Sequence, residues 1–285
     1  AEITADRFHL VSGEAGELSF QAVNRSPVQV QLSALKLSGV LLDSVLLQPM
    51  GQNRQVNIQI RKQLLKGLPL SAPYWLREPH PQGYFTVNQP ELITLPENPP
   101  ALEGTVTFRI GEEELTMKVP VLHKSTDPVK GEIYRPVEIL PPVVIGIDHP
   151  VVMFPDNAMR EITVRLTSVS RNSRPGVLVV TGPSGWSVTP SRVPFEFSKP
   201  GQVLSFPVRV TPSSESVTGD LKFSATTGEW VCNTSVEEIT YDHIPVQTLQ
   251  PPAVVRLVRS PVAIVGKHIG YVPGAGDEIP DALRA

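Results

Sequence analysis

Cysteine, long apolar runs and an excess of charge of either sign are all scarce in this sequence. The 285 residues include a single cysteine, which excludes an internal disulfide. The formal net charge is only −3, with acidic and basic residues mixed, so nothing in the sequence attracts phosphate backbones or anionic lipid. No apolar run approaches the roughly 20 residues that a membrane-spanning helix needs. We therefore expect neither nucleic-acid binding nor a membrane span.

Proline, by contrast, is abundant and dispersed along the whole chain. There are 30 prolines among the 285 residues, whereas the usual share is about 5%. Proline cannot donate a hydrogen bond to a β-ladder and is confined to strand starts, edges and loops, so long helices are not expected. The length is about twice that of a typical domain, which predicts two compact units with a core each.

The order of apolar and polar residues predicts an all-β fold. Residues 18–23 and 28–32 each alternate in polarity and flank a turn at 24–27, which predicts a hairpin-like meander. Alternation or a short buried run recurs at residues 56–60, 106–110, 115–119, 160–166, 177–180, 185–188, 204–210 and 221–225. This strand spacing is typical of two tandem immunoglobulin-like β-sandwiches.

The domain boundaries are placed by composition. The proline-rich stretch 126–142 has the stiff, extended character of an interdomain connector. We therefore predict a first β-sandwich domain at 1–132 and a second, immunoglobulin-like one at 133–250. Residues 251–285 are expected to be a linker and the β-turn-α start of a following α/β domain, with a strand at 264–272. This strand is expected to dock, either on the second sandwich through Ile269, Tyr271 and Val272 or on another copy of the chain, rather than to be disordered. The helix that begins near residue 279 would be unfinished at Ala285, which suggests a longer polypeptide.

Residues that could carry out chemistry are isolated from one another. The histidines occur singly, without the close pairing that zinc sites usually show, at His9, His80, His123, His149, His243 and His268. Cys232 follows Trp230 and Val231 in a predicted strand and is interpreted as a core residue. No Gly-x-Ser-x-Gly elbow or Walker loop is present. We expect no catalytic residue, no metal ligand and no cofactor in this chain.

One cluster of aromatic residues is a candidate site. It lies in a proline-rich stretch that is predicted to be a loop, and it comprises Tyr74, Trp75, His80, Tyr84 and Phe85. Aromatic side chains on the loops of a sandwich can stack on sugar rings, dock a neighbouring domain, or close the end of their own sandwich. All three roles remain open from the sequence.

Four segments carry a resemblance to a known family. They are residues 71–76 (SAPYWL), 124–132 (KSTDPVKGE), 134–138 (YRPVE) and 241–245 (YDHIP). With them, nearly the whole chain resembles the region downstream of the catalytic domain in large bacterial PIG-L/LmbE-like proteins, the N-acetylglucosaminyl-phosphatidylinositol de-N-acetylase family. The resemblance implies an amino-terminal metal-dependent deacetylase domain before this region and a glutamine-amidotransferase-like domain after it.

The family's catalytic His-Pro-Asp-Asp motif is absent from this chain. His80-Pro81 continues with Gln82, and His149-Pro150 continues with Val151, so neither pair matches the motif. We therefore expect a non-catalytic spacer region of an exported, periplasmic or secreted bacterial enzyme that acts on N-acetylated sugars. Its partners would be the other domains of the same polypeptide. The alternative is a carbohydrate-binding module that uses the aromatic loop to hold a glycan near the catalytic domain.

Overall fold

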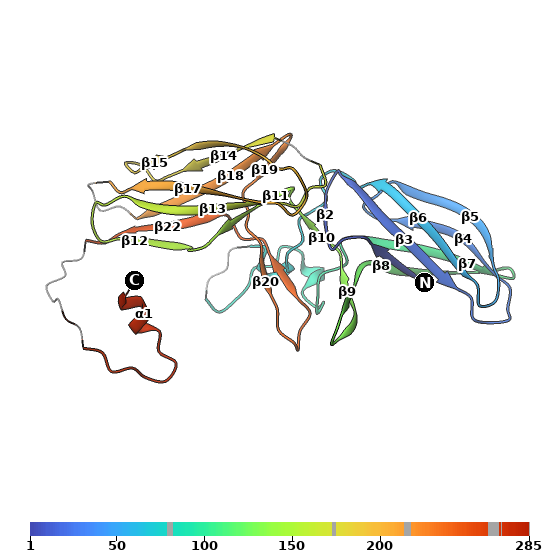
Figure 1. The fold of residues 1–285 in the computed structure, drawn as a ribbon. Helices are drawn as coiled ribbons and strands as arrows, with labels where there is room; N and C mark the ends of the chain where they lie inside the picture. Colours follow the sequence, from blue (N-terminus) through green and yellow to red (C-terminus); the bar gives the residue numbers. More distant parts are fainter. Residues whose placement is uncertain (79–81, 173–174, 214–217, 262–267, 269, 285) are drawn as a thin grey trace.

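The computed structural model describes residues 1–78, 82–172, 175–213, 218–261, 268 and 270–284. Its ribbon forms two β-sandwiches that lie end to end, joined near β2 (His9–Val11) and β10 (Glu138–Leu140) (Figure 1). Each sandwich has its own core of buried apolar side chains, and no core residue of one belongs to the other. Among the described residues, no helix is long and apolar enough to cross a membrane. The chain is therefore a two-domain, all-β protein, as predicted.

The first sandwich contains two sheets that meet along one long strand. Its strands are β1 (Glu2–Ala5), β3 (Ala15–Val23), β4 (Val30–Leu37), β5 (Leu42–Met50), β6 (Gln55–Gln63), β7 (Glu103–Ile110), β8 (Glu113–Asp127) and β9 (Gly131–Pro136). The strand order is β5-β4-β7-β8-β1-β3-β6, and β9 pairs with β8. The first half of β8 pairs with β7, and the second half pairs with β1 in parallel. Phe20, Leu32, Val106 and Val121 fill the space between the sheets.

The second sandwich contains two separate sheets. One has the order β11-β13-β17-β15, and the other has the order β12-β22-β18-β14-β16 with β19 paired to β18. The bounds are β11 (Val143–Ile147), β12 (Val151–Phe154), β13 (Arg160–Ser168), β14 (Pro175–Thr181), β15 (Ser187–Thr189), β16 (Arg192–Glu196), β17 (Val203–Thr211), β18 (Gly219–Thr227), β19 (Trp230–Cys232) and β22 (Val254–Arg259). Phe154, Leu166, Leu178 and Phe223 lie between the sheets and are almost fully buried.

The two sandwiches share one pairing scheme. In the first, β3 pairs with β6, β4 with β7 and β7 with β8, and the opening strand β1 joins β3 and β8. In the second, β13 pairs with β17, β14 with β18 and β18 with β22. Its opening segment is divided, so that β11 pairs with β13 and β12 pairs in parallel with β22. Two sheets with these connections, antiparallel except where β1 meets β8 and β12 meets β22, form an immunoglobulin-like sandwich, which confirms the predicted fold class.

The predicted meander of residues 18–23 and 28–32 is wrong, although both strands exist. β3 pairs with β1 and β6, whereas β4 pairs with β5 and β7 in the other sheet. The turn at 24–27 therefore crosses from one sheet to the other. Alternation predicts that a strand has one buried face, but it does not choose the strand's neighbour.

The structure also corrects the predicted boundary at residue 132. Residues 126–142 do not form an extended connector, because β9 folds back on β8 and the Asp127 carboxylate accepts the Val129 and Lys130 amides in the turn. β10 then pairs in parallel with β2, so the chain leaves the first sandwich only at residues 141 and 142, both prolines. The turn residues Asp127 and Gly131 explain why a proline-rich stretch forms a hairpin.

The boundary at residue 250 is corrected as well. β22 lies beyond it and occupies a place in the sheet between β12 and β18, with Val255 and Leu257 fully buried. In the tail, α1 (Ile279–Arg284) confirms the predicted helix start. Val272 is 91% exposed, so the predicted docking through this side chain is not observed. The described residues of 264–272 form no strand, and Ile269 lies outside the described residues.

Candidate functional site

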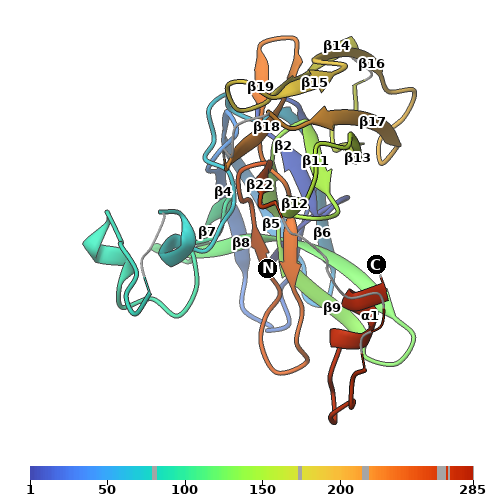
Figure 2. The same cartoon turned by 90° about the vertical axis from the view of Figure 1, so that its left-hand side faces the viewer.

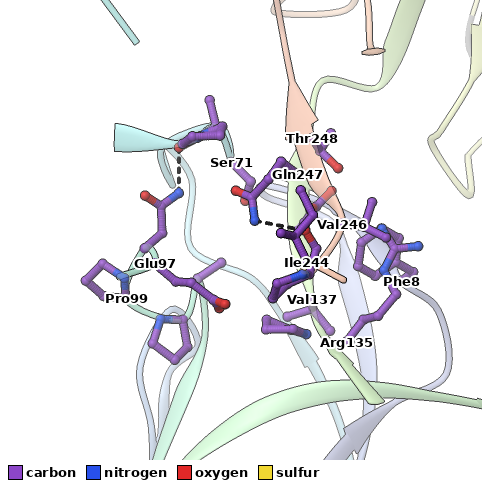
Figure 3. A pocket seen from close by; sticks show the side chains of 18 of the residues that line it. Phe8, Ser71, Glu97, Pro99, Arg135, Val137, Ile244, Val246, Gln247 and Thr248 are labelled. Carbon is purple, nitrogen blue, oxygen red and sulfur yellow. Dashed lines mark hydrogen bonds between the residues drawn. The ribbon is translucent and has the colours of Figure 1, made fainter. Parts of the chain in front are cut away.

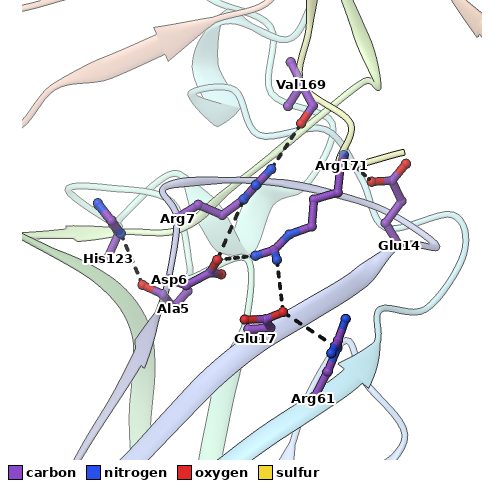
Figure 4. Close-up of polar contacts among 9 residues, drawn as sticks. All are labelled: Ala5, Asp6, Arg7, Glu14, Glu17, Arg61, His123, Val169 and Arg171. Carbon is purple, nitrogen blue, oxygen red and sulfur yellow. Dashed lines mark hydrogen bonds and ion pairs between the residues drawn. The ribbon is translucent and has the colours of Figure 1, made fainter. Parts of the chain in front are cut away.

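The junction of the two sandwiches contains a buried carboxylate. Glu14 belongs to the first sandwich, and only 6% of its surface is exposed. One carboxylate oxygen accepts the Ser170 hydroxyl at 2.5 Å, and the other accepts the Arg171 amide at 3.1 Å (Figure 4). Both donors belong to the second sandwich. A carboxylate that leaves water for such a position needs these hydrogen bonds, so the contact is formed only when the two domains are docked in this arrangement.

Two arginines extend the polar contact around Glu14. The Arg171 guanidinium donates to Glu17 at 3.2 Å and forms an ion pair with Asp6 (Figure 4). From the first sandwich, Arg7 donates to the Val169 carbonyl oxygen at 3.4 Å. Burial, and then the positive charge of Arg171, lower the pKa of Arg7, while the nearby carboxylates oppose that shift. The carboxylates of the first sandwich thus surround a cation of the second.

A second contact joins two hairpins. The β8–β9 hairpin of the first sandwich faces the hairpin of β20 (Glu237–Ile239) and β21 (Gln247–Leu249). Lys130 pairs with Asp242 at 2.7 Å, and Arg135 pairs with Glu238 at 3.5 Å. The Lys130–Asp242 hydrogen bond raises the pKa of the lysine and lowers the pKa of the aspartate. Lys130, Asp242 and Glu238 are exposed, and Arg135 is half-buried with its guanidinium over the Phe8 ring. Each pair therefore adds little to stability but fixes which hairpins face each other.

A single glutamine connects three segments beneath these hairpins. The Gln250 side-chain amide donates to the Ser71 carbonyl at 2.6 Å and to the Ile139 carbonyl at 3.2 Å. Ser71 in turn uses its hydroxyl to accept the Ile139 amide at 2.9 Å. Ser71, near the start of the long loop between β6 and β7, is therefore held against β10, which contains Ile139, and against Gln250 in the segment that leads into β22.

The predicted aromatic cluster lies on that long loop, which projects to one side of the molecule (Figure 2). Tyr74 opens the 3₁₀ turn Tyr74–Leu76 and is buried, and its hydroxyl donates to the Leu95 carbonyl at 2.9 Å. Trp75 is half-buried, with its ring edge-on to Tyr74 at 4.9 Å. Tyr84 and Phe85 are 65% and 53% exposed. His80 lies outside the described residues. The four described residues do not form a single site: Tyr74 anchors the loop, while Tyr84 and Phe85 lie on its surface.

A cavity of about 670 Å³ opens beside the junction. The β6–β7 loop, β9 and the β20–β21 hairpin enclose it (Figure 3). Its walls combine proline rings with Ile133, Ile244 and Val246, and the Glu97 carboxylate lies on the loop side. This volume is within the usual range for small-ligand sites. The described members of the predicted aromatic cluster, Tyr74, Trp75, Tyr84 and Phe85, do not line it.

The remaining reactive residues do not converge. In the described part of the chain, no three His, Cys, Asp or Glu side chains are arranged to hold a metal ion. Cys232 is buried, which confirms that it is a core residue. Burial raises the pKa of its thiol to about 11, so the thiol is protonated at neutral pH.

Native Cys232 should therefore resist alkylation. Iodoacetamide at about pH 8 should leave the folded chain unmodified, because only the thiolate reacts and the residue is shielded from solvent. Mass spectrometry should detect one adduct after unfolding in guanidinium chloride. Rapid modification of the folded chain would contradict the buried position.

Comparisons with known proteins give distant likenesses. No family model matches the sequence, and no curated protein matches it. Native α2-macroglobulin of E. coli is 13% identical with a TM-score of 0.31, over 90% of this chain and 17% of that chain. Methylamine-reacted α2-macroglobulin of Salmonella is 8% identical with a TM-score of 0.32, over 90% of this chain and 16% of that chain. Domains 4 and 5 of the S-layer protein SbsC are 15% identical with a TM-score of 0.22, over 55% of this chain and 64% of that chain.

This chain thus spans 17% and 16% of the two macroglobulins, far less than two thirds of either. At these TM-scores the likenesses decide nothing about function. The class of protein is defined by the strand pairing, as a pair of immunoglobulin-like sandwiches with a hydrogen-bonded junction.

Proposed function

We propose that this chain is a non-catalytic spacer that holds the domains on either side of it at a fixed separation and orientation. The observation that supports this role is the buried Glu14 carboxylate, which accepts two hydrogen bonds from the other sandwich. The crossing between the sandwiches is short and contains Pro141 and Pro142, which restrict backbone rotation. A rigid spacer needs interdomain hydrogen bonds and a short, restricted linker of this kind, whereas a flexible linker does not.

The parent protein is, in this proposal, an exported bacterial PIG-L/LmbE-like deacetylase of N-acetylated sugars, secreted or periplasmic. The resemblance at residues 71–76, 124–132, 134–138 and 241–245 supports it. The reading frame of the gene gives the test. A His-Pro-Asp-Asp motif upstream of Ala1 in the same frame is expected, and a frame without that motif would contradict the parent while leaving the spacer role open.

Glu14→Ala should loosen the junction without unfolding either sandwich. The Arg171 amide would lose its acceptor, at a cost of about 1–3 kcal/mol for an unpaired donor, and the Ser170 hydroxyl would keep only the Asn172 carbonyl oxygen, at 3.1 Å. Small-angle X-ray scattering should show a larger radius of gyration and a broader distance distribution. Glu113→Ala is the matched control, since this carboxylate is exposed at the far end of β8. Equal scattering from the Glu14→Ala variant and the parent chain would contradict the bracing role.

A carbohydrate-binding module is the second candidate, and the exposure of Tyr84 and Phe85 favours it. Exposed aromatic faces can stack on sugar rings. Calorimetric titration with chitin oligosaccharides tests this function. Binding that is lost in Tyr84→Ala and kept in Tyr271→Ala, which changes an exposed tyrosine of the carboxyl-terminal tail, would support the module.

A further inference from the structure

The cavity at the junction exposes the edges of strands as well as side chains. Four consecutive β9 residues, from Ile133 to Pro136, line it, and Gln247 and Thr248 of β21 line it from the other domain. Successive side chains of a strand point to opposite faces, so a surface that touches every residue of a run touches its main-chain edge. Two strand edges, one from β9 of the first sandwich and one from the separate β20–β21 hairpin, therefore border the same cavity.

Neither edge is used within the described residues. There, β9 pairs with β8 alone, and β21 pairs with β20 alone. Figures 1 and 2 show the two hairpins projecting from the body on the same side. An unpaired edge next to an apolar wall is the arrangement that binds an added strand, with main-chain hydrogen bonds for affinity and side-chain contacts for selectivity.

The lining favours a ligand that is rich in hydrogen-bond donors and positively charged. Six of its residues are prolines, which offer carbonyl oxygens but no N–H group: Pro69, Pro73, Pro99, Pro100, Pro136 and Pro245. Lys130 and Arg135 of the lining are already paired with Asp242 and Glu238.

Two lining carboxylates are left to meet a ligand. In the described structure, Glu91 and Glu97 have no ion-pair partner, and the side chain of Arg77 is the one unpaired cation of the lining. Figure 3 shows Glu97 on the loop wall opposite Ile244 and Val246. A ligand with cationic groups on one side and apolar groups on the other would therefore place its cations near the glutamates and its apolar groups near Ile244 and Val246.

We propose that this cavity binds an extended, basic peptide segment of a partner, which adds a strand at the free edge of β9 and places lysine or arginine side chains beside Glu91 and Glu97. The inference goes beyond the spacer role and is independent of the identity of the parent protein. It would give the spacer a defined docking point for a neighbouring polypeptide.

A direct test titrates the full chain into a fluorescein-labelled pentapeptide of alternating lysine and valine. The fluorescence anisotropy of the peptide measures binding. We expect saturable binding that weakens about fivefold when Glu91→Gln and Glu97→Gln are combined, the loss for two exposed charge pairs. The matched control combines Glu112→Gln and Glu113→Gln at the distant β7–β8 turn, and it should bind like the parent chain. Hydrogen exchange should show protection of β9 amides in the complex.

Several results would overturn the proposal. They are no saturable binding up to about 5 mM peptide, equal binding of a glutamate–valine peptide, or equal binding by the Glu91→Gln, Glu97→Gln variant. Binding of a glucosamine trimer in place of the peptide would also overturn it and would assign the cavity to a cationic sugar. None of these results depends on the scattering experiment on Glu14, so the spacer role and the peptide site can fail separately.

Discussion

A chain truncated after Gln250 should lose the unfolding transition of the second sandwich, whereas a chain truncated after Arg259 should keep it. The first truncation removes β22, which lies between β12 and β18 and buries Val255 and Leu257 completely. Each of these side chains contributes roughly 1.5–3 kcal/mol by burial. Their loss, together with two ladders of backbone hydrogen bonds, is comparable with the 5–15 kcal/mol that stabilises a typical domain.

Differential scanning calorimetry on the two truncated chains measures this effect. The chain that ends at Arg259 lacks the tail but retains every strand that the structure describes in the two sandwiches, so it is the matched control. Its main transitions should shift by no more than a few degrees. Retention of the second transition in the shorter chain would contradict the assignment of β22 to the core.

Trp186→Ala should destabilise the second sandwich by about 3–5 kcal/mol. Trp186 follows Gly185 in the turn before β15, and its amide donates to the Pro183 carbonyl at 3.2 Å. The side chain is buried in the second core, edge-on to Phe154 with ring centroids 4.9 Å apart. Truncation would leave a cavity among residues that the two sheets hold in place, so little of it could collapse.

Chemical denaturation followed by circular dichroism gives the free energy of unfolding for this variant. Trp186→Phe is the informative control, because the buried indole nitrogen has no hydrogen-bond partner among the described residues. The phenylalanine variant should keep the ring contact, lose no hydrogen bond and cost less than the alanine variant. If the denaturation midpoint of the Trp186→Ala variant were close to that of the parent chain, the Trp186 ring would not support the core.

Local patterns in the sequence predicted which residues form strands, but not which strands pair. The alternation at 18–23 and 160–166 matches β3 and β13, whose buried positions follow the same period. Pairing depends on contacts between residues far apart in the sequence, and alternation carries no information about them. The prediction of a connector at 126–142 is wrong for a different reason, because proline and turn residues are common to connectors and to hairpins.

The site was less predictable than the fold. Glu14 and Arg171 are single charged residues in unremarkable surroundings, and they meet only because the two sandwiches dock. The aromatic composition of the β6–β7 loop predicted a site there, yet Tyr74 packs within the loop and none of the described members of that cluster lines the cavity. Two features that the sequence analysis did identify lie at the cavity: prolines of that loop and residues of the segment 241–245. Neither feature predicted that the two would meet there.

The central claim is that the two sandwiches keep one fixed relation to each other. Pulsed electron–electron double resonance between spin labels on Glu112→Cys and Ala158→Cys measures it. Glu112 lies between β7 and β8, and Ala158 lies between β12 and β13, so the two labels are on different sandwiches. The strands of the two sandwiches lie end to end in Figure 1. Cys232 is buried and should remain unlabelled. The account predicts a single narrow distance distribution that broadens in Glu14→Ala. A broad distribution in the unmodified junction would contradict it.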